Sequence, residues 1–145
     1  EGRKIIDQYT TSTICMFKIT NLEEINQKYS RELGNKTITQ ISDYIKENIS
    51  NQYVFVRYMG PKFVIAFSGV EVNGVAEFLN DLKEKLERTK ITIKNQENEE
   101  EQTTLPRLNF AISTYYKGTG LEEILKKLEE YLDNADKAES DITNI

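Results

Sequence analysis

The strongest pattern of apolar positions along the chain lies in residues 53–68, where two apolar runs flank a short break. Both runs are rich in β-branched and aromatic residues, and the break is Met59-Gly60-Pro61-Lys62. Runs of this length around a Gly-Pro pair are typical of a β-hairpin. Gly60 can adopt the positive φ of the first position of a type II′ turn, and Pro61 suits the second. Neither run alternates regularly with polar residues, which predicts two central strands covered on at least one face.

The other strands are predicted by shorter runs of the same kind. Residues 11–19 and 108–116 are each rich in β-branched and apolar side chains, and residues 91–93 are a short third candidate. Residues 95–104 are polar and acidic, so we expect a solvated surface loop there.

Four helices are predicted because apolar residues recur at intervals of three and four. Thr20 and Asn21 offer side-chain oxygens that could cap the first helix. The helical pattern of this segment ends near Ser30. Gly34-Asn35 should separate the first helix from the second. The predicted helices cover about residues 22–29, 36–49, 75–88 and 121–138.

This order of elements predicts one α/β (α+β) domain. If an additional helix and strand are set aside, the remaining order of elements is β-α-β-β-α-β, which is the split arrangement of ferredoxin-like domains. We expect a mainly antiparallel central sheet with helices on one face. The domain is assigned to residues 11–138, with residues 1–10 as the end of a truncated lead-in and residues 139–145 as a C-terminal tail.

Composition narrows the possible functions. A length of 145 residues, with 38% hydrophobic and 30% charged residues, suits one globular domain with its own core. A net charge of −5 without a basic stripe argues against nucleic-acid binding. The chain has no His, the commonest general base and metal ligand. The single Cys15 cannot form an internal disulfide, and we interpret it as a small buried apolar residue in a reducing cytoplasm. No apolar run approaches a membrane span and no signal peptide is visible, so we expect a cytoplasmic domain, alone or as the cytoplasmic part of a larger protein, that makes no membrane contact.

Three sequence blocks carry a more specific resemblance. They are F-K-I-T-N-L-E-E-I-N-Q-K-Y at residues 17–29, Gly34-Asn35, and R-Y-M-G-P-K-F at residues 57–63. In residue types and spacing they resemble D-x-D-x-F-K-x-I-N-D-x-Y, Gly-Asp and R-Y-G-G-D-E-F of GGDEF domains, over residues 11–138. The resemblance implies the palm fold of nucleotidyl cyclases. It also implies a bacterial diguanylate cyclase, which joins two GTP molecules into cyclic di-GMP with two magnesium ions and works as a dimer.

The positions that would hold the metal depart from the family pattern. The resemblance places metal-binding carboxylates at Lys18 and Pro61, and the signature Glu at Lys62. An ammonium has no lone pair for a metal at neutral pH, and its charge repels one. Two hard cations need carboxylate oxygens for this chemistry. We therefore expect no metal, no cofactor and no catalysis. The degenerate signature comprises Met59, Gly60, Pro61, Lys62 and Phe63.

Other positions implied by the resemblance have changed as well. The basic residues that hold the triphosphate fall at Asp136 and Ser140, where acid would repel phosphate. The product-binding R-x-x-D motif falls at Ser50 and Tyr53, so feedback binding of cyclic di-GMP is not expected. Gly60 should keep the turn compact.

Two interpretations of the altered site stay open. Lys18 and Lys62 should approach one another, so their ammoniums either replace the magnesium ions and hold a nucleotide or are solvated remnants of a lost site. Asn26 matches a guanine-contacting Asn of the family, but could instead be satisfied by a nearby backbone group. Asn35 replaces a guanine-contacting Asp with an amide, which is poorly matched to the two guanine donors.

The sequence therefore favours a catalytically inactive GGDEF-like domain. Its expected role is that of a regulatory or protein-interaction module in a bacterial signalling protein, contacting a partner protein or a second copy of itself. The alternative is a metal-independent sensor that binds GTP or a related nucleotide without turnover.

Overall fold

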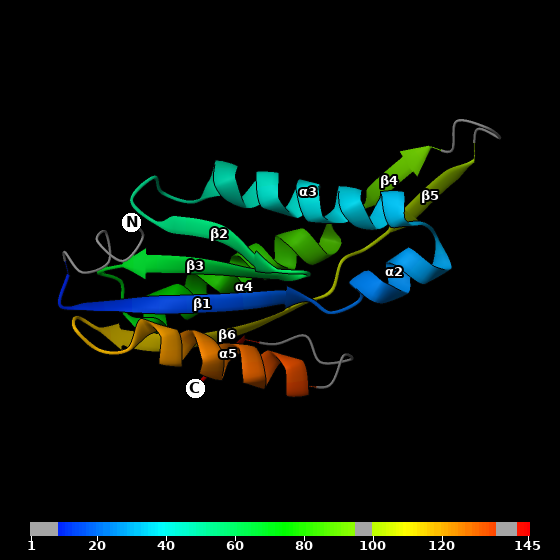
Figure 1. Ribbon diagram of the computed structural model, residues 1–145. Coiled ribbons are helices and arrows are strands. Elements are labelled where there is room, and N and C mark those ends of the chain that lie inside the picture. Colours follow the sequence, from blue (N-terminus) through cyan, green and yellow to red (C-terminus); the bar gives the residue numbers. More distant parts are fainter. Residues whose placement is uncertain (1–8, 95–99, 136–141) are drawn as a thin grey trace.

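A computed structural model of the chain describes residues 9–94, 100–135 and 142–145. A five-stranded sheet forms its centre, helices cover both faces, and a two-stranded ribbon extends from one end (Figure 1). The strands are β1 (Thr11–Ile19), β2 (Val54–Met59), β3 (Lys62–Ser68), β4 (Ile91–Lys94), β5 (Glu101–Thr104), β6 (Leu108–Tyr116) and β7 (Ile142–Asn144). The helices are α2 (Leu22–Lys28), α3 (Arg31–Asn48), α4 (Val72–Arg88) and α5 (Leu121–Asn134).

The sheet has the strand order β2-β3-β1-β6-β7. β1 pairs antiparallel with β3 and β6, and β2 pairs antiparallel with β3, which confirms the predicted mainly antiparallel arrangement. β1 and β6 have the predicted bounds. β7 adds a fifth strand parallel to β6, so residues 142–144, which we predicted to be a tail, belong to the sheet.

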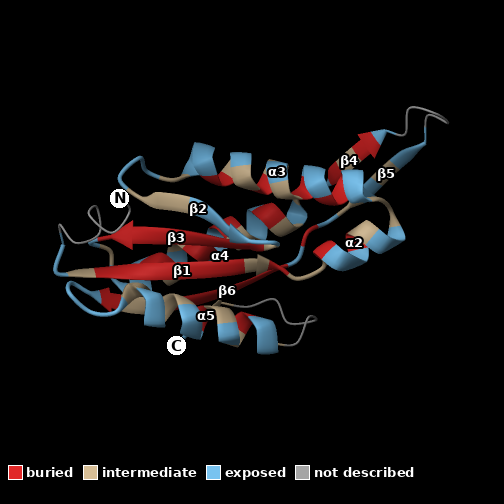
Figure 2. Ribbon diagram, viewed as in Figure 1, coloured by how far each residue is buried: buried red, intermediate tan, exposed pale blue. Residues whose placement is uncertain are grey.

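Helices cover both faces of the sheet, and the prediction that they cover one face was wrong. Cys15 and Phe17 of β1 pack in the core under α3 and α4, whereas Ile14 and Met16 pack in a second core under α5. Every residue of β3 is buried, which requires cover on both sides (Figure 2). Cys15 is a fully buried apolar residue, as predicted, and burial raises the pKa of its thiol well above the ordinary range.

The predicted hairpin is β2 and β3, joined through Gly60 with φ of 59°. β3 is a central strand, but β2 lies at the edge of the sheet and is exposed from Val56 to Met59 (Figure 2). The prediction of two central strands was therefore wrong for β2, because β-branched composition does not distinguish an edge strand from a central one.

The first two helices meet at Ser30, and the predicted break at Gly34-Asn35 was wrong. Ser30 caps α3 by accepting a hydrogen bond from the Leu33 N–H at 3.1 Å. Gly34 lies inside α3 and is buried, and a Cβ at this position would overlap Asn26 Oδ1 of α2. The glycine allows α2 and α3 to approach closely, and it does not break the helix.

Asn21 precedes α2, but its side chain does not cap that helix as predicted. Asn21 Nδ2 donates to the Leu105 carbonyl oxygen, and its Oδ1 accepts from the Arg107 N–H, both at 2.9 Å. These bonds hold the segment that leads into β6 against the end of β1.

Part of the predicted acidic loop is a strand. Residues 101–104 form β5, which pairs antiparallel with β4 in the small ribbon, and residues 95–99 lie outside the described part of the chain. Thr92 and Thr103 oxygens lie 2.9 Å apart across the ribbon. The strand was missed because its polar residues lie on a largely exposed ribbon and leave no apolar pattern. In the described residues, no helix has the length and apolar character needed to cross a membrane.

Candidate functional site

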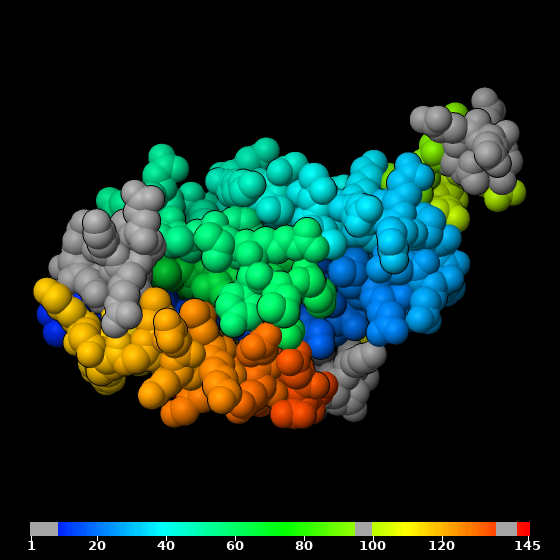
Figure 3. All heavy atoms as spheres, in the orientation of Figure 1, coloured from blue at the N-terminus to red at the C-terminus, as the bar shows by residue number. Residues whose placement is uncertain are grey.

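The candidate site lies where the end of β1 meets the tip of the hairpin. Lys18 and Lys62 are direct partners in the register between β1 and β3, which confirms that they approach one another. Directly paired residues project to the same face of a sheet, so both lysines extend to the face that α5 covers. Figure 3 shows the hairpin and α5 side by side on this surface of the molecule.

Two carboxylates on α5 meet these lysines. Lys62 Nζ lies 3.0 Å from Glu129 Oε2 and 2.8 Å from Asp133 Oδ1. Lys18 Nζ lies 3.7 Å from the same Asp133 oxygen. Glu129 and Asp133 are four residues apart and therefore share one face of α5. These four residues, here called the lysine–carboxylate cluster, carry two positive and two negative charges.

Lys62 is the most buried member of the cluster, with 11% of its side chain exposed. Burial alone lowers its pKa, but hydrogen bonds to Asp133 and Glu129 and the charges of both carboxylates outweigh burial. The net effect raises the pKa of Lys62 above its ordinary value. Lys62 is therefore a permanent cation at neutral pH, and its charge is already balanced by α5.

The magnesium ions implied by the resemblance do not fit these residues. Lys18 and Pro61 supply no carboxylate, and the Pro61 carbonyl oxygen accepts a hydrogen bond from the Ile19 N–H at 3.0 Å. Glu129 and Asp133 do supply oxygens, but both contact the Lys62 ammonium. Across the described ranges, no group of three or more His, Cys, Asp or Glu side chains could hold a metal ion.

A pocket of about 300 Å³ lies beside the cluster, between the end of β1, α2 and the hairpin tip. Lys18 and Asn26 both line it. Asn26 Oδ1 is buried and has no hydrogen-bond partner, so the interpretation that a backbone group satisfies this oxygen was wrong. Asn35 is exposed on α3 and does not line this pocket. Of the candidate nucleotide-binding residues, the structure thus places only Lys18 and Asn26 in this pocket. The pocket is lined by Lys18, Ile19, Thr20, Leu22, Glu23, Asn26 and Pro61.

The signature segment keeps the architecture of a tight turn. Arg57 Nε donates to the Gly60 carbonyl oxygen at 3.0 Å. Phe63 is fully buried, with its ring centroid 4.9 Å from Phe17 and 5.8 Å from Phe55. Met59, in contrast, is 65% exposed. The turn and its aromatic anchor are therefore retained, whereas the polar groups at the tip differ from the pattern that the resemblance implies.

Of the remaining predicted positions, the structure describes Ser50 and Tyr53. Ser50 is exposed, and Tyr53 packs against Phe67 with ring centroids 5.1 Å apart. Asp136 and Ser140 lie outside the described residues.

Sequence reasoning missed Glu129 and Asp133. Their signal was available as two acidic residues one turn apart on α5, but this pattern is also that of a solvated helix face. Only the strand register and the packing of α5 show that they face Lys18 and Lys62.

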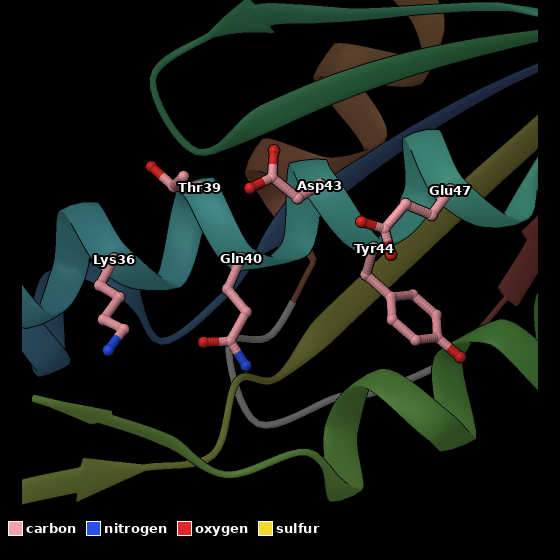
Figure 4. Close-up of a pocket in the computed structure, with 6 residues that line it drawn as sticks. All are labelled: Lys36, Thr39, Gln40, Asp43, Tyr44 and Glu47. Carbon is pink, nitrogen blue, oxygen red and sulfur yellow. The ribbon is translucent and has the colours of Figure 1, made fainter.

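A second pocket, of about 330 Å³, follows the outer side of α3. In Figure 4, Lys36, Gln40 and Tyr44 point to one side of the helix, and Thr39 and Asp43 to the other. Lys36 Nζ donates to the Thr92 carbonyl oxygen at 2.6 Å, which ties α3 to β4. The pocket is lined by Lys36, Thr39, Gln40, Asp43, Tyr44 and Glu47.

Several solved structures have the same fold. The GGDEF domain of DgcB from Caulobacter crescentus, solved in complex with c-di-GMP, gives a TM-score of 0.80 at 14% identity, covering 97% of this chain and 81% of that one. Diguanylate cyclase SiaD of Pseudomonas aeruginosa, solved with its activator SiaC, gives 0.80 at 9% identity, covering 94% of this chain and 50% of that one. Identities this low show the fold alone.

Sequence comparisons give a distant relative and a matching family. An uncharacterized membrane protein of Staphylococcus aureus (strain USA300) is 19% identical over 96 residues, which is 66% of this chain and 27% of that protein. The match thus spans about a quarter of the length of this relative. Residues 3–141 match the family described as diguanylate cyclase, GGDEF domain. Because this match covers nearly the whole sequence, the chain belongs to the GGDEF domain family.

Proposed function

We propose that this chain is a catalytically inactive GGDEF domain that acts as a regulatory or protein-interaction module in a bacterial signalling protein. The observation that carries the proposal is the lysine–carboxylate cluster. At the corner where the family chemistry needs carboxylates for two metal ions, Lys62 forms ion pairs with Glu129 and Asp133. The fold is retained around this corner, which supports a role for its surface in place of a reaction.

A role in protein contacts has support among the structural neighbours. The SiaD structure contains a GGDEF-family cyclase in complex with an activator protein. This chain has the same fold, so a protein partner or a second copy of the chain is a reasonable ligand for it.

The direct test is an assay for product. Purified chain is incubated with GTP and either Mg²⁺ or Mn²⁺, and cyclic di-GMP is quantified by mass spectrometry. An active diguanylate cyclase domain serves as the positive control. We expect no product above a buffer control, and product that depends on the added metal would overturn the proposal.

A repair variant tests the assignment of the metal positions. Lys18→Asp, Pro61→Asp and Lys62→Glu together restore carboxylates and leave them beside Glu129 and Asp133. We expect calorimetry to show binding of Mn²⁺ or Mg²⁺, with little or no turnover. The absence of binding would refute the assignment of Lys18 and Pro61 to the metal positions.

The control for this experiment changes charge elsewhere. Lys126→Glu with Lys127→Glu alters two exposed residues of α5 and produces a nearly equal change in net charge. This variant should bind no metal, which separates a local site from non-specific attraction to an acidic protein.

A second candidate function is a metal-independent nucleotide sensor. The observation that favours it is the pocket beside β1, where Asn26 Oδ1 is buried without a partner and Lys18 provides a cation. Against it, Lys18 and Lys62 are both within ion-pair distance of Asp133, so their charges are not free for phosphate.

Thermal shift separates the two candidates. A ligand that binds only the folded state raises the unfolding temperature by mass action. GTP, ATP and cyclic di-GMP are each tested with Mg²⁺ and with EDTA. A shift with GTP that survives EDTA would favour the sensor, and no shift with any nucleotide would favour the interaction module.

A further inference from the structure

β2 is an open edge of the central sheet. The strand order begins with β2, and within the described ranges no strand pairs with its outer side. An edge strand presents unpaired N–H and C=O groups and is a template for another strand. Proteins usually protect such edges with charged residues, proline or a bulge.

This edge is apolar and lightly protected. Val56, Tyr58 and Met59 are 46%, 38% and 65% exposed, and all three lie within four positions of one strand. β2 contains no Lys, Asp, Glu or Pro, and its only charged residue is Arg57. A bulge between Arg57 and Met59 protects only the end nearest the turn. Clustered exposed apolar residues of this kind mark a contact surface.

The hydrogen-bond pattern shows which backbone groups face outward. Ile19 N–H donates to the Pro61 carbonyl oxygen, where β1 meets the start of β3. The direction of the backbone hydrogen bonds alternates along an antiparallel strand. The backbone groups of every second residue after Pro61 therefore bond to β1, and the backbone groups of the residues in between bond to β2. Val56 pairs with Val64, one of the residues that bond to β2, so the backbone groups of Val56 point toward β3. Its neighbours Phe55 and Arg57 therefore direct their N–H and C=O groups to the open edge.

We propose that a second copy of this chain pairs its β2 antiparallel with this edge, about a two-fold axis at Val56. Val56 then lies opposite Val56 of the second copy, and Phe55 lies opposite Arg57 of the second copy. The outward N–H and C=O groups of Phe55 and Arg57 bond each other across the axis, which is one of the registers that the hydrogen-bond pattern permits. One continuous sheet would run through both copies.

The side chains of β2 are complementary to themselves in this register. On the α5 side, Val56 meets Val56 of the second copy, so apolar side chains face each other at the axis. On the other side, Arg57 lies opposite Phe55, so no like charges meet across the axis. A strand with acidic or basic residues on the α5 side would bury charge against this apolar row, which favours the chain's own strand as the occupant.

The inference rests on the proposed function, because it names the surface through which the interaction module acts. Its failure is nevertheless distinguishable. A monomeric chain would overturn the interface and leave the absence of cyclase activity standing. A dimer that made cyclic di-GMP would overturn the proposed function and leave the interface standing.

The test is sedimentation analysis of the purified chain over a wide concentration range. We expect a reversible monomer–dimer equilibrium. Val56→Lys places two ammoniums opposite each other at the axis and should weaken the dimer roughly tenfold or more. Leu105→Lys is the matched control, because Leu105 is 45% exposed but lies outside β2, and it should leave the equilibrium unchanged.

Mixing two variants makes the test specific for the axis. Val56→Lys and Val56→Glu should each dimerise more weakly than the wild type when alone and should form a heterodimer when mixed, because opposite charges then meet. Circular dichroism confirms that each variant is folded. A wild-type chain that stays monomeric at the highest concentration, or a dimer unaffected by Val56→Lys, would overturn the proposal.

Discussion

Replacing Lys62 with methionine tests how strongly the cluster holds α5 to the hairpin. Methionine keeps most of the apolar stem and removes only the ammonium. In the wild type this ammonium contacts Glu129 at 3.0 Å and Asp133 at 2.8 Å. In the variant, Lys18 at 3.7 Å from Asp133 is the only cation left in the cluster. We therefore expect a lower free energy of unfolding.

The size of this loss follows from the exposure of the partners. Breaking a fully buried ion pair by removing one partner costs about 3–5 kcal/mol, and an exposed pair contributes about 0.2–1 kcal/mol. Lys62 is 11% exposed, but Glu129 is 26% and Asp133 is 47% exposed, so water solvates much of the charge that is left behind. We expect a loss of about 1–2.5 kcal/mol, between these limits.

The assay is urea unfolding at pH 7, followed by circular dichroism. Arg88→Met is the matched control, because the Arg88–Glu84 pair is 2.9 Å apart but its side chains are 77% and 56% exposed. That control should lose less than about 0.5 kcal/mol. A Lys62→Met variant as stable as the wild type would refute the reasoning, since desolvation of Lys62 would then cancel its attraction to α5.

Three further predictions follow from other contacts. The folded-state pKa of Lys62 is raised, so its stabilisation is complete below the unfolded pKa of about 10.4 and is lost as pH rises through the folded value. The stability difference between wild type and Lys62→Met, from unfolding at pH 7 to 11, should therefore shrink at the alkaline end, and a difference that grew would contradict this. Gly34→Ala should cost about 1–3 kcal/mol in urea unfolding because the new Cβ overlaps Asn26 Oδ1, and adding Asn26→Ala should recover most of the loss. Asn21→Ala removes two hydrogen bonds to residues 105–107 and should cost about 0.5–2 kcal/mol, measured by the same method, whereas no change would show that these bonds are replaced by water.

The parts of the fold that sequence predicted well are those where burial and local preference agree. β1 and β6 were predicted to the residue because they are buried, β-branched strands in the centre of the sheet. The start of α3 was misplaced because Gly34 has low helix propensity, and only its contact with Asn26 explains a glycine inside a helix. β5 was missed because a polar strand on an exposed ribbon carries no apolar pattern.

The candidate site was predictable only in part. The pairing of Lys18 with Lys62 followed from the expected topology. The carboxylates that balance them come from α5, more than a hundred residues after Lys18 in the sequence, and local pattern does not show which polar residues of a helix meet a distant strand. The exposure of β2 was likewise set by its place in the strand order, which its own residues do not encode.

The lysine–carboxylate cluster also bears on how this domain could change in evolution. A single mutation from Lys62 to an acidic residue would bring a third carboxylate to Glu129 and Asp133, opposed by Lys18 alone. Such an intermediate would be destabilised by like-charge repulsion before it regained any metal site. A first step at Lys62 would therefore lower the stability of the fold, so the cluster disfavours a return to metal chemistry that begins at this position.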